Sequence, residues 1–566
     1  MRDYLSLSAL NIVFRILMIL LLLSGLQAAS STENTLNISI GPYAQAMKSF
    51  EIDPTLSSKV WPDIGGLENY HSYTHYSPLI EVNGDGNIIP WMAESFEVSD
   101  DTKTVTFHLR EGVRFADETP LNASILKFNF DRLITHGYTD LRDIYNLPIY
   151  IYYDYSEAAD ERTFKVHFSQ GWLNVARDLS STPTLSAFIH PQDVTPAWDI
   201  KGILRSDKRY NGLGPYWVDE NESTPNQVVV LKKRHSWRDD LNFHKPKADK
   251  IVLKYIEDPE VAIKALEKGE IDYICRYWNP SLSSIVPLEN NPKITIKTRP
   301  DARTYYLATA YWKEPFNGSD GILLRKAMCY AIDRKEIVAS AFRGYATEAI
   351  DTMYLSPQLP EVPACCQQGY NHNPEMAKRL LSEAGWKDSD GDGLLDKNGK
   401  PLESLDLTIS SAPGLEWMQD VAVIVRSQLK NIGIAINIQT FDYNGYKESR
   451  KVGDYELLLA GSNVRTYPMA QQMLIFNSSM MSFKAKYDNV NNSLADLVYN
   501  AYMASNREER DGYICDACNI LFEDVGLIPL VHPMEYAIMS SEFKGFEFGS
   551  GWGDYEHLEE CTLIDY

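Results

Sequence analysis

The stretch IPWMAESFEVSDDTKTVTFHLREGVRF, residues 89–115, is the most informative part of this chain for its fold. Within it, Thr104–Leu109 alternates polar and apolar side chains, which is typical of a β-strand with one face in the core. Arg110 and Arg114 continue the alternation with apolar neighbours, so we expect both arginines on a solvated face. The stretch therefore predicts a half-buried strand in a mixed sheet.

Segments further along the chain alternate between strand and helix patterns. Residues 262–269 and 377–385 have helical spacing and end in glycine, a common stop signal for a helix. Strands are predicted at 228–231, 251–253 and 434–438, and helices at 262–269, 377–385 and 421–429. Helix and strand in repeated succession predict an α/β fold built in layers.

Composition and charge exclude several classes of protein. The chain has 566 residues, with 54 Lys and Arg against 77 Asp and Glu, which gives a formal net charge of −23. Its length predicts two or three lobes, and its 44% hydrophobic residues exclude wholesale disorder. Nucleic acid is not an expected partner, because phosphate binding needs a concentrated basic surface.

The N-terminus predicts export from the cytoplasm. Arg2 and Arg15 precede the apolar run Ile16–Leu23, and small residues follow up to Ser30. This order is typical of a secretory signal peptide, here residues 1–29, and the run is too short to span a bilayer. The alternative is a retained N-terminal anchor that tethers the protein to the membrane.

Seven cysteines fit an exported chain. Cys515 and Cys518 form a single C-x-x-C pair, which is a weak zinc motif, so a local disulfide between them is the simpler interpretation. Cys365 and Cys366 form another close pair, and the connectivity stays open. An odd number leaves at least one thiol unpaired within the chain.

Recognised enzyme motifs are absent from the sequence. It contains no G-x-x-x-x-G-K-[ST], G-x-S-x-G, H-E-x-x-H or G-x-G-x-x-G pattern. We therefore expect no enzymatic activity and no required cofactor. An exported hydrolase with carboxylates brought together from distant positions is the alternative from another class.

Several blocks of the sequence resemble the peptide/nickel class of extracellular solute-binding proteins, which serve ABC importers. The stretch at 89–115 is similar to the signature of that family. Further similar blocks follow in the family's order at 212–216 (GLGPY), 269–272 (GEID), 324–334, 377–386, 429–434, 528–530 and 544–546. The resemblance covers nearly the whole chain after the N-terminal segment.

The resemblance implies a two-lobed fold of the periplasmic-binding-protein type, class II, with hinge crossover strands. Lobe I takes residues 30–295 and 525–566, with an extra subdomain at about 90–210, and lobe II takes 296–524. The implied function is a receptor that captures a peptide-like or chelated-metal solute between its lobes and delivers it to an ABC permease. The resemblance further implies a monomer in the periplasm or on the cell surface.

The segment 457–468 departs from both named branches of the family. Peptide-binding members use an Asp here to hold the peptide amino group, whereas this chain has Asn463 and Arg465. A guanidinium prefers a carboxylate or phosphate, so Arg465 predicts an anionic ligand end. Tyr467 resembles an aromatic position of nickel-binding members, but residues 478–488 contain no histidine to ligate the metal. A peptide-like solute and a nickel or other metal chelate both stay open.

Two further segments carry candidate binding residues. Tyr73 and Tyr76 lie among histidines at helical spacing, which predicts either a ligand-binding wall or an ordinary amphipathic helix. Asp388, Asp390, Asp392 and Asp396 have the spacing of positions 1, 3, 5 and 9 of an EF-hand loop, with glycine at position 6. Position 12 is glycine, so the choice lies between a structural calcium loop and a plain surface turn.

Overall fold

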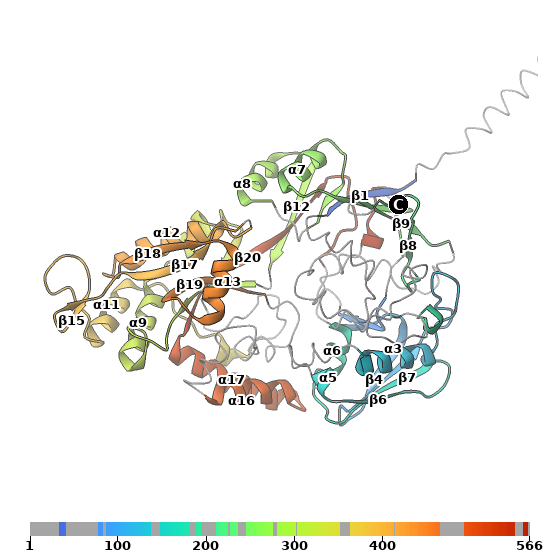
Figure 1. Ribbon diagram of the computed structural model, residues 1–566, viewed down its shortest axis with the longest axis horizontal. Helices are drawn as coiled ribbons and strands as arrows, with labels where there is room; N and C mark the ends of the chain where they lie inside the picture. The colour runs from blue at the N-terminus through green and yellow to red at the C-terminus, as the bar shows by residue number, and fades with distance from the viewer. Residues whose placement is uncertain are drawn as a thin grey trace, which may run out of the picture.

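Figure 1 shows the computed structural model of the chain, in which two groups of helices and strands are joined by β12 (Ile294–Pro300) and β20 (Leu527–Ser540). The described residues are 33–40, 77–82, 87–136, 148–181, 188, 190–193, 211–224, 227–235, 245–275, 280–301, 303–350, 363–412, 414–463, 492–548 and 558–563.

Strand β20 connects the two groups because its halves pair with different parts of the chain. Its first half pairs antiparallel with β13 (Arg303–Thr309), where Leu527 lies opposite Ala308. Its second half pairs antiparallel with β12, where Ser540 lies opposite Ile294. Because β13 follows β12 almost directly, the chain passes between the groups twice at one place, as crossover strands do.

One large mixed sheet runs through both groups. Its order is β18-β17-β19-β13-β20-β11-β1-β10-β9-β8, with β12 and β14 also paired to β20. Strands β17, β18 and β19 are parallel neighbours joined through helices, which is the βαβ arrangement. The strands not yet given bounds are β1 (Thr35–Ile40), β8 (Tyr216–Val218), β9 (Val228–Lys233), β10 (Lys250–Tyr255), β11 (Tyr273–Ile274), β14 (Ala346–Glu348), β17 (Leu405–Ser410), β18 (Ile436–Phe441) and β19 (Leu457–Asn463).

Lobe II is the group whose hydrophobic core runs from Tyr306 to Val531. In its helix α12 (Trp417–Lys430), Val421, Val425 and Leu429 recur on one face and are buried in that core. The other elements of lobe II are α9 (Gly318–Ala331), α10 (Arg334–Ser340), η6 (Ala364–Cys366), α11 (Pro374–Glu383), β15 (Asp396–Lys397), β16 (Lys400–Pro401), α13 (Tyr443–Val452), α16 (Asn492–Met503) and α17 (Arg507–Asp524).

Lobe I packs short helices against the other half of the sheet. Helix α7 (Pro259–Glu267) begins where the Asp258 side chain accepts a hydrogen bond from the Glu260 backbone N–H at 2.8 Å, with proline in the first turn. It ends before Gly269, which has a positive φ of 73°. The remaining elements are α8 (Leu282–Ile285), η5 (Val286–Asn290) and η8 (Leu558–Glu560).

A separate core, from Leu79 to Leu213, defines what we call the subdomain. It is built on a four-stranded antiparallel sheet in the order β4-β5-β7-β6. Its elements are β2 (Ile80–Val82), β3 (Ile88–Pro90), β4 (Ala93–Val98), β5 (Thr104–Leu109), α3 (Ala123–His136), α5 (Pro148–Ile151), β6 (Tyr153–Ala158), β7 (Thr163–Phe168), α6 (Val175–Ser181) and η3 (Pro191–Asp193).

The predicted elements are confirmed, with one local correction. Strand β5 has the predicted bounds and the predicted alternation of buried and half-buried residues. The prediction of a solvated face is wrong for Arg110, because this side chain is half-buried and its Nε donates to the Trp91 carbonyl at 2.6 Å. Burial accordingly lowers the pKa of Arg110. The residue bounds of the lobes and of the subdomain stay a prediction.

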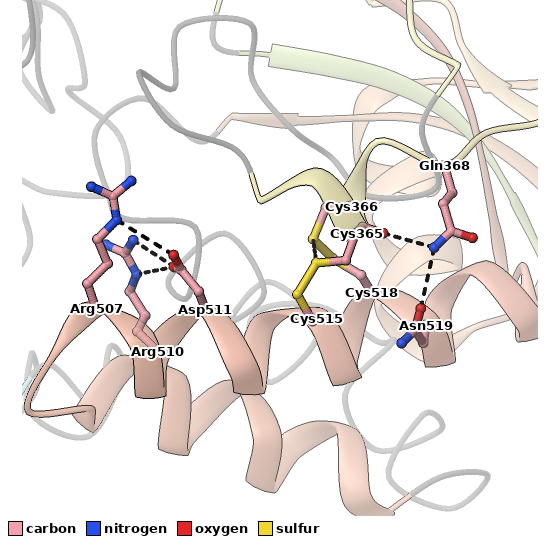
Figure 2. The surroundings of a disulfide bond; sticks show 9 residues. All are labelled: Cys365, Cys366, Gln368, Arg507, Arg510, Asp511, Cys515, Cys518 and Asn519. Atoms are coloured by element: carbon pink, nitrogen blue, oxygen red, sulfur yellow. Dashed lines mark hydrogen bonds and ion pairs between the residues drawn. A yellow bond between two sulfur atoms is a disulfide. The ribbon is translucent and has the colours of Figure 1, made fainter.

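The cysteine pairing differs from the local disulfide that the sequence predicts. Among the described residues, Cys365 is bonded to Cys515 and Cys366 to Cys518, so η6 is held against α17 by adjacent bridges (Figure 2). The prediction of a bond within the C-x-x-C pair is wrong because both of its thiols face η6 from one side of a helix. The remaining cysteines, Cys275, Cys329 and Cys561, are buried and take no part in either bridge.

The N-terminal segment 1–29 lies outside the described residues, so its cleavage or retention stays a prediction. Within the described part of the chain, no helix combines the length and the apolar character that crossing a membrane requires.

Candidate functional site

The predicted ligand-binding segment, 457–468, begins with β19, which pairs with β13 next to the crossover and ends at Asn463. In the register of the sheet, Asn463 lies opposite Arg303, the first residue of β13. Asn463 is therefore placed at the junction of the two lobes, although its side chain is outside the described structure. The other predicted ligand-binding residues lie outside the described part of the chain: Arg465, Tyr467, Tyr73 and Tyr76. Their role in binding stays a prediction.

Charged side chains cluster at this junction. Arg303 Nε donates to the Asp301 carboxylate at 2.5 Å, and Arg299 on β12 forms an ion pair with Glu535 on β20. Both carboxylates are buried, whereas the Arg303 side chain is 34% exposed. Buried charges are tolerated when they are paired, so each carboxylate fixes one arginine at the hinge and offsets its charge.

Aromatic rings stack beside the charged cluster. Tyr305 on β13 lies parallel to Trp417 at the start of α12, with ring centroids 3.9 Å apart and planes 4° from parallel. Phe342 packs against both rings, at 5.8 Å from Tyr305 and 6.2 Å from Trp417. The Trp417 indole N–H is buried and has no hydrogen-bond partner in the described part of the chain. The stack is a rigid aromatic surface next to Arg303.

Gly461 on β19 makes room for this stack. It lies opposite Tyr305 in the sheet, and a Cβ at this position would lie 2.8 Å from the Tyr305 ring. Carbon atoms in contact normally lie about 3.5–4.0 Å apart, so no side chain fits here without moving the ring.

His532 lies in the same region of β20 but is not exposed. It is buried, and its Nδ1 lies 3.1 Å from the Thr304 hydroxyl. Burial lowers the pKa of His532 to about 4, so the ring is neutral near pH 7. Its contact with Thr304 ties β20 to β13 at the crossover.

Sequence reasoning missed Arg299, Arg303, Tyr305, Trp417 and Glu535. A signal was present, because the predicted lobe boundary at 295–296 falls within β12, and the charged and aromatic run Arg299–Tyr305 follows directly. Residues at the crossover lie next to both lobes, so charged residues there could have been proposed as part of the site. Their partners on β20 and α12 are far away in sequence, so these contacts could be found only from the three-dimensional structure.

The predicted metal loop is only partly assembled. The carboxylates of Asp388, Asp390 and Asp392 lie within 4.8 Å of one another and are exposed. The two oxygens of Asp388 accept the backbone N–H groups of Gly391 and Gly393 at 2.7 and 3.0 Å. Such bonds are those of a plain turn, so calcium binding stays a prediction.

Asp396, the fourth candidate, does not join the other three carboxylates. It lies on β15, and its carboxylate accepts the backbone N–H of Ser389 at 2.8 Å as well as the Ser389 hydroxyl. These bonds lower the pKa of Asp396 below 3.8. The structure therefore groups three of the four predicted ligands.

Comparison with known proteins identifies the class to which this fold belongs. The model of the bacterial extracellular solute-binding proteins, family 5 Middle, matches residues 87–482. The nickel-binding periplasmic protein of Escherichia coli is 26% identical over 401 residues, which cover 68% of this chain and 71% of that protein. The oligopeptide-binding protein AppA of Bacillus subtilis is 26% identical over 486 residues, covering 84% of this chain and 83% of that protein.

A solved structure supports the same fold. The crystal structure of NikA from Brucella suis in complex with Fe(III)-EDTA has a TM-score of 0.77 and 21% identity, covering 93% of this chain and 99% of that one. The fold is therefore the two-lobed fold of extracellular solute-binding proteins. Within that class, the chain belongs to family 5, which confirms the resemblance seen in the sequence.

Proposed function

We propose that this chain is the receptor of an ABC importer that captures a peptide-like or chelated-metal solute between its lobes and delivers it to the permease. The observation that carries the proposal is the double crossover of β12–β13 and β20, because two lobes whose covalent connection is a pair of such strands can close like a hinge. Membership of family 5 supports the same function.

For the solute, we propose that Arg465 binds an anionic end and that Tyr467 stacks on its body, with Asn463 beside them. Arg303, the neighbouring cation opposite Asn463, is already paired with Asp301. Arg465, two residues beyond Asn463 in the sequence, adds a further positive charge to this segment. Tyr73 and Tyr76 are proposed as part of the opposite wall.

The alternative within the same family is a protein specific for nickel or another metal chelate. A relative named as nickel-binding and a similar fold crystallised with Fe(III)-EDTA support it. Residues 478–488 lack histidine, so we expect any metal to arrive with its ligands already bound. An anionic chelate would present carboxylates to Arg465 in the same way as a peptide terminus.

We propose further that the protein is a monomer, is exported to the periplasm or the cell surface, and has no enzymatic activity. The family is extracellular, which supports the location. Tethering through the N-terminal segment is the alternative to release of the mature protein. An exported hydrolase remains the alternative of another class, and turnover of labelled peptides by the purified protein would establish it.

The test of the solute assignment is substitution of Arg465. A hydrogen bond to a charged group contributes about 1.5–3 kcal/mol, so Arg465→Ala should weaken binding by about ten- to a hundredfold. The solute is first identified by mass spectrometry of the material that co-purifies, and affinity is then measured by calorimetry.

Arg379→Ala is the matched control, because Arg379 is exposed on α11 within lobe II. Wild-type affinity in Arg379→Ala together with the expected loss in Arg465→Ala supports the anchor. Wild-type affinity in Arg465→Ala contradicts it, and Asn463 and Tyr467 then lose most of their support. A co-purified solute that carries a transition metal selects the chelate alternative.

A further inference from the structure

The end of helix α16 lies against the subdomain, on the side of the molecule away from β12 and β20 (Figure 1). Met503, the last residue of α16, packs against the core of lobe II and against the core of the subdomain. The Leu173 backbone N–H donates to the Ala504 carbonyl at 2.9 Å. The two lobes are therefore joined by direct contact as well as by the crossover strands.

A buried carboxylate is at the centre of this contact. Oδ2 of Asp178 on α6 accepts one hydrogen bond from the Trp172 indole N–H at 2.7 Å and another from the Tyr502 hydroxyl at 2.6 Å. Asp178 and Tyr502 are 324 residues apart. Tyr502 belongs to the core of lobe II, whereas Trp172 and Leu179, next to Asp178, belong to the core of the subdomain. Asp178, Trp172 and Tyr502 are each at most 3% exposed. Nearby, the hydroxyls of Tyr152 and Tyr499 lie 2.5 Å apart.

We propose that Asp178, Trp172 and Tyr502 form a latch that holds the lobes closed and that weakens when Asp178 is ionised. The proposal rests on the proposed function, since closure around a solute is the step that the latch regulates. When the lobes separate, the hydrogen bond from Tyr502 to Asp178 breaks, because Trp172 and Asp178 both lie in the subdomain and stay together. Opening therefore exposes the carboxylate to water.

Among the described residues, two arginines carry charge that acts on this site. The Arg177 charge on α6 favours the ionised form of the Asp178 carboxylate, and the Arg510 charge on α17 opposes that of Arg177. The Arg510 guanidinium donates to Asp511 at 2.7 Å, so its charge is partly offset (Figure 2). Burial raises the pKa of Asp178 from 3.8 to about 7, and the hydrogen bonds and Arg177 only partly oppose this.

The direction of the pH dependence follows from linkage. An exposed aspartate has an ordinary pKa of 3.8, which we take for the open form, whereas burial in the closed form raises it to about 7. The closed form therefore binds more protons between these values, so closure is favoured below about pH 4 and loses that advantage as pH rises through 7. Between pH 8 and pH 6 the ratio of closed to open molecules should rise about tenfold.

The experiment measures the distance between the lobes in solute-free protein. Spin labels are placed at introduced cysteines E97C in the subdomain and D420C on α12, both exposed positions, and distance distributions are recorded at pH 6 and pH 8. We expect the closed population to grow about tenfold relative to the open one at pH 6. Asp178→Asn, which keeps the shape and cannot ionise, should abolish this response.

Tyr502→Phe removes the hydroxyl from the latch and should lower the closed-to-open ratio roughly tenfold. Tyr446→Phe is the matched control, because the Tyr446 hydroxyl is buried and donates to the Leu459 carbonyl at 2.8 Å within lobe II alone. It should behave like the wild type.

Two outcomes would overturn the latch: a wild-type pH response in Asp178→Asn, or a wild-type distance distribution in Tyr502→Phe. If Asp178→Asn does not fold, Tyr502→Phe decides alone. Failure of the proposed function is a separate result. A wild-type protein that closes with pH and binds no solute keeps the latch and contradicts the receptor.

Discussion

At the scale of single residues, the junction of the lobes depends on how closely β19 and β13 approach. Gly461 lets the Tyr305 ring lie over β19 and stack on Trp417. The ion pair of Arg299 with Glu535 joins β12 to β20 at the point where the chain crosses. The position of the predicted ligand-binding segment thus rests on one glycine and on two buried carboxylates.

Gly461→Ala should destabilise the protein by about 1–3 kcal/mol, since the added methyl must push the Tyr305 ring out of its stack. The measurement is the free energy of unfolding in urea. Gly512→Ala on α17 is the matched control, because nothing lies within 4 Å of a Cβ there and alanine is favoured in helices. Equal stability of Gly461→Ala and the wild type would contradict this account of the stack.

The candidate site shows where sequence reasoning stops. Asn463 was predicted from the resemblance of residues 457–468 to the ligand-binding segment of the family, and its role in binding stays a prediction. Its opposite residue Arg303 is 160 positions earlier, and which residue pairs with which depends on the register of β13 and β19. Register is set by packing across the whole sheet, so the pairing cannot be read from local patterns.

At the scale of elements, local signals predicted several helices and strands along the chain and failed for the disulfides of lobe II. Strand β5 and helices α7, α11 and α12 were visible because alternation, capping residues and terminal glycines act over a few positions. The contact of η6 with α17 spans about 150 residues, and nothing near either cysteine pair encodes it. These helices and strands could therefore be predicted from the sequence, whereas the contact between η6 and α17 could not.

Removing the first of the two disulfides should lower the free energy of unfolding less than removing the second. They close almost the same loop, with sequence separations of 150 and 152, so either bridge alone restrains the unfolded chain. Replacing Cys366 and Cys518 with serine should therefore cost little, whereas replacing all four cysteines should cost about 4–5 kcal/mol. Urea unfolding under non-reducing conditions measures both. Equal costs for the first and the second bridge would contradict the shared-loop explanation.

At the scale of the whole molecule, two lobes are joined in two different ways. The crossover strands β12–β13 and β20 are covalent and permanent, whereas the contact of α16 with the subdomain is non-covalent. A molecule built in this way can open around the strands and close at the contact. Family membership supplies the reason for such motion, which is the capture of a solute outside the cytoplasm.

The most direct test of the receptor is small-angle scattering on wild-type protein at pH 8, first stripped of solute and then saturated with the solute that co-purifies. At this pH the closed form of the stripped protein lacks the advantage that protonation of Asp178 gives it at lower pH. We predict that the radius of gyration falls when the solute binds, because the lobes close around it. An unchanged radius at saturating solute would contradict the account of a two-lobed receptor that closes on its ligand.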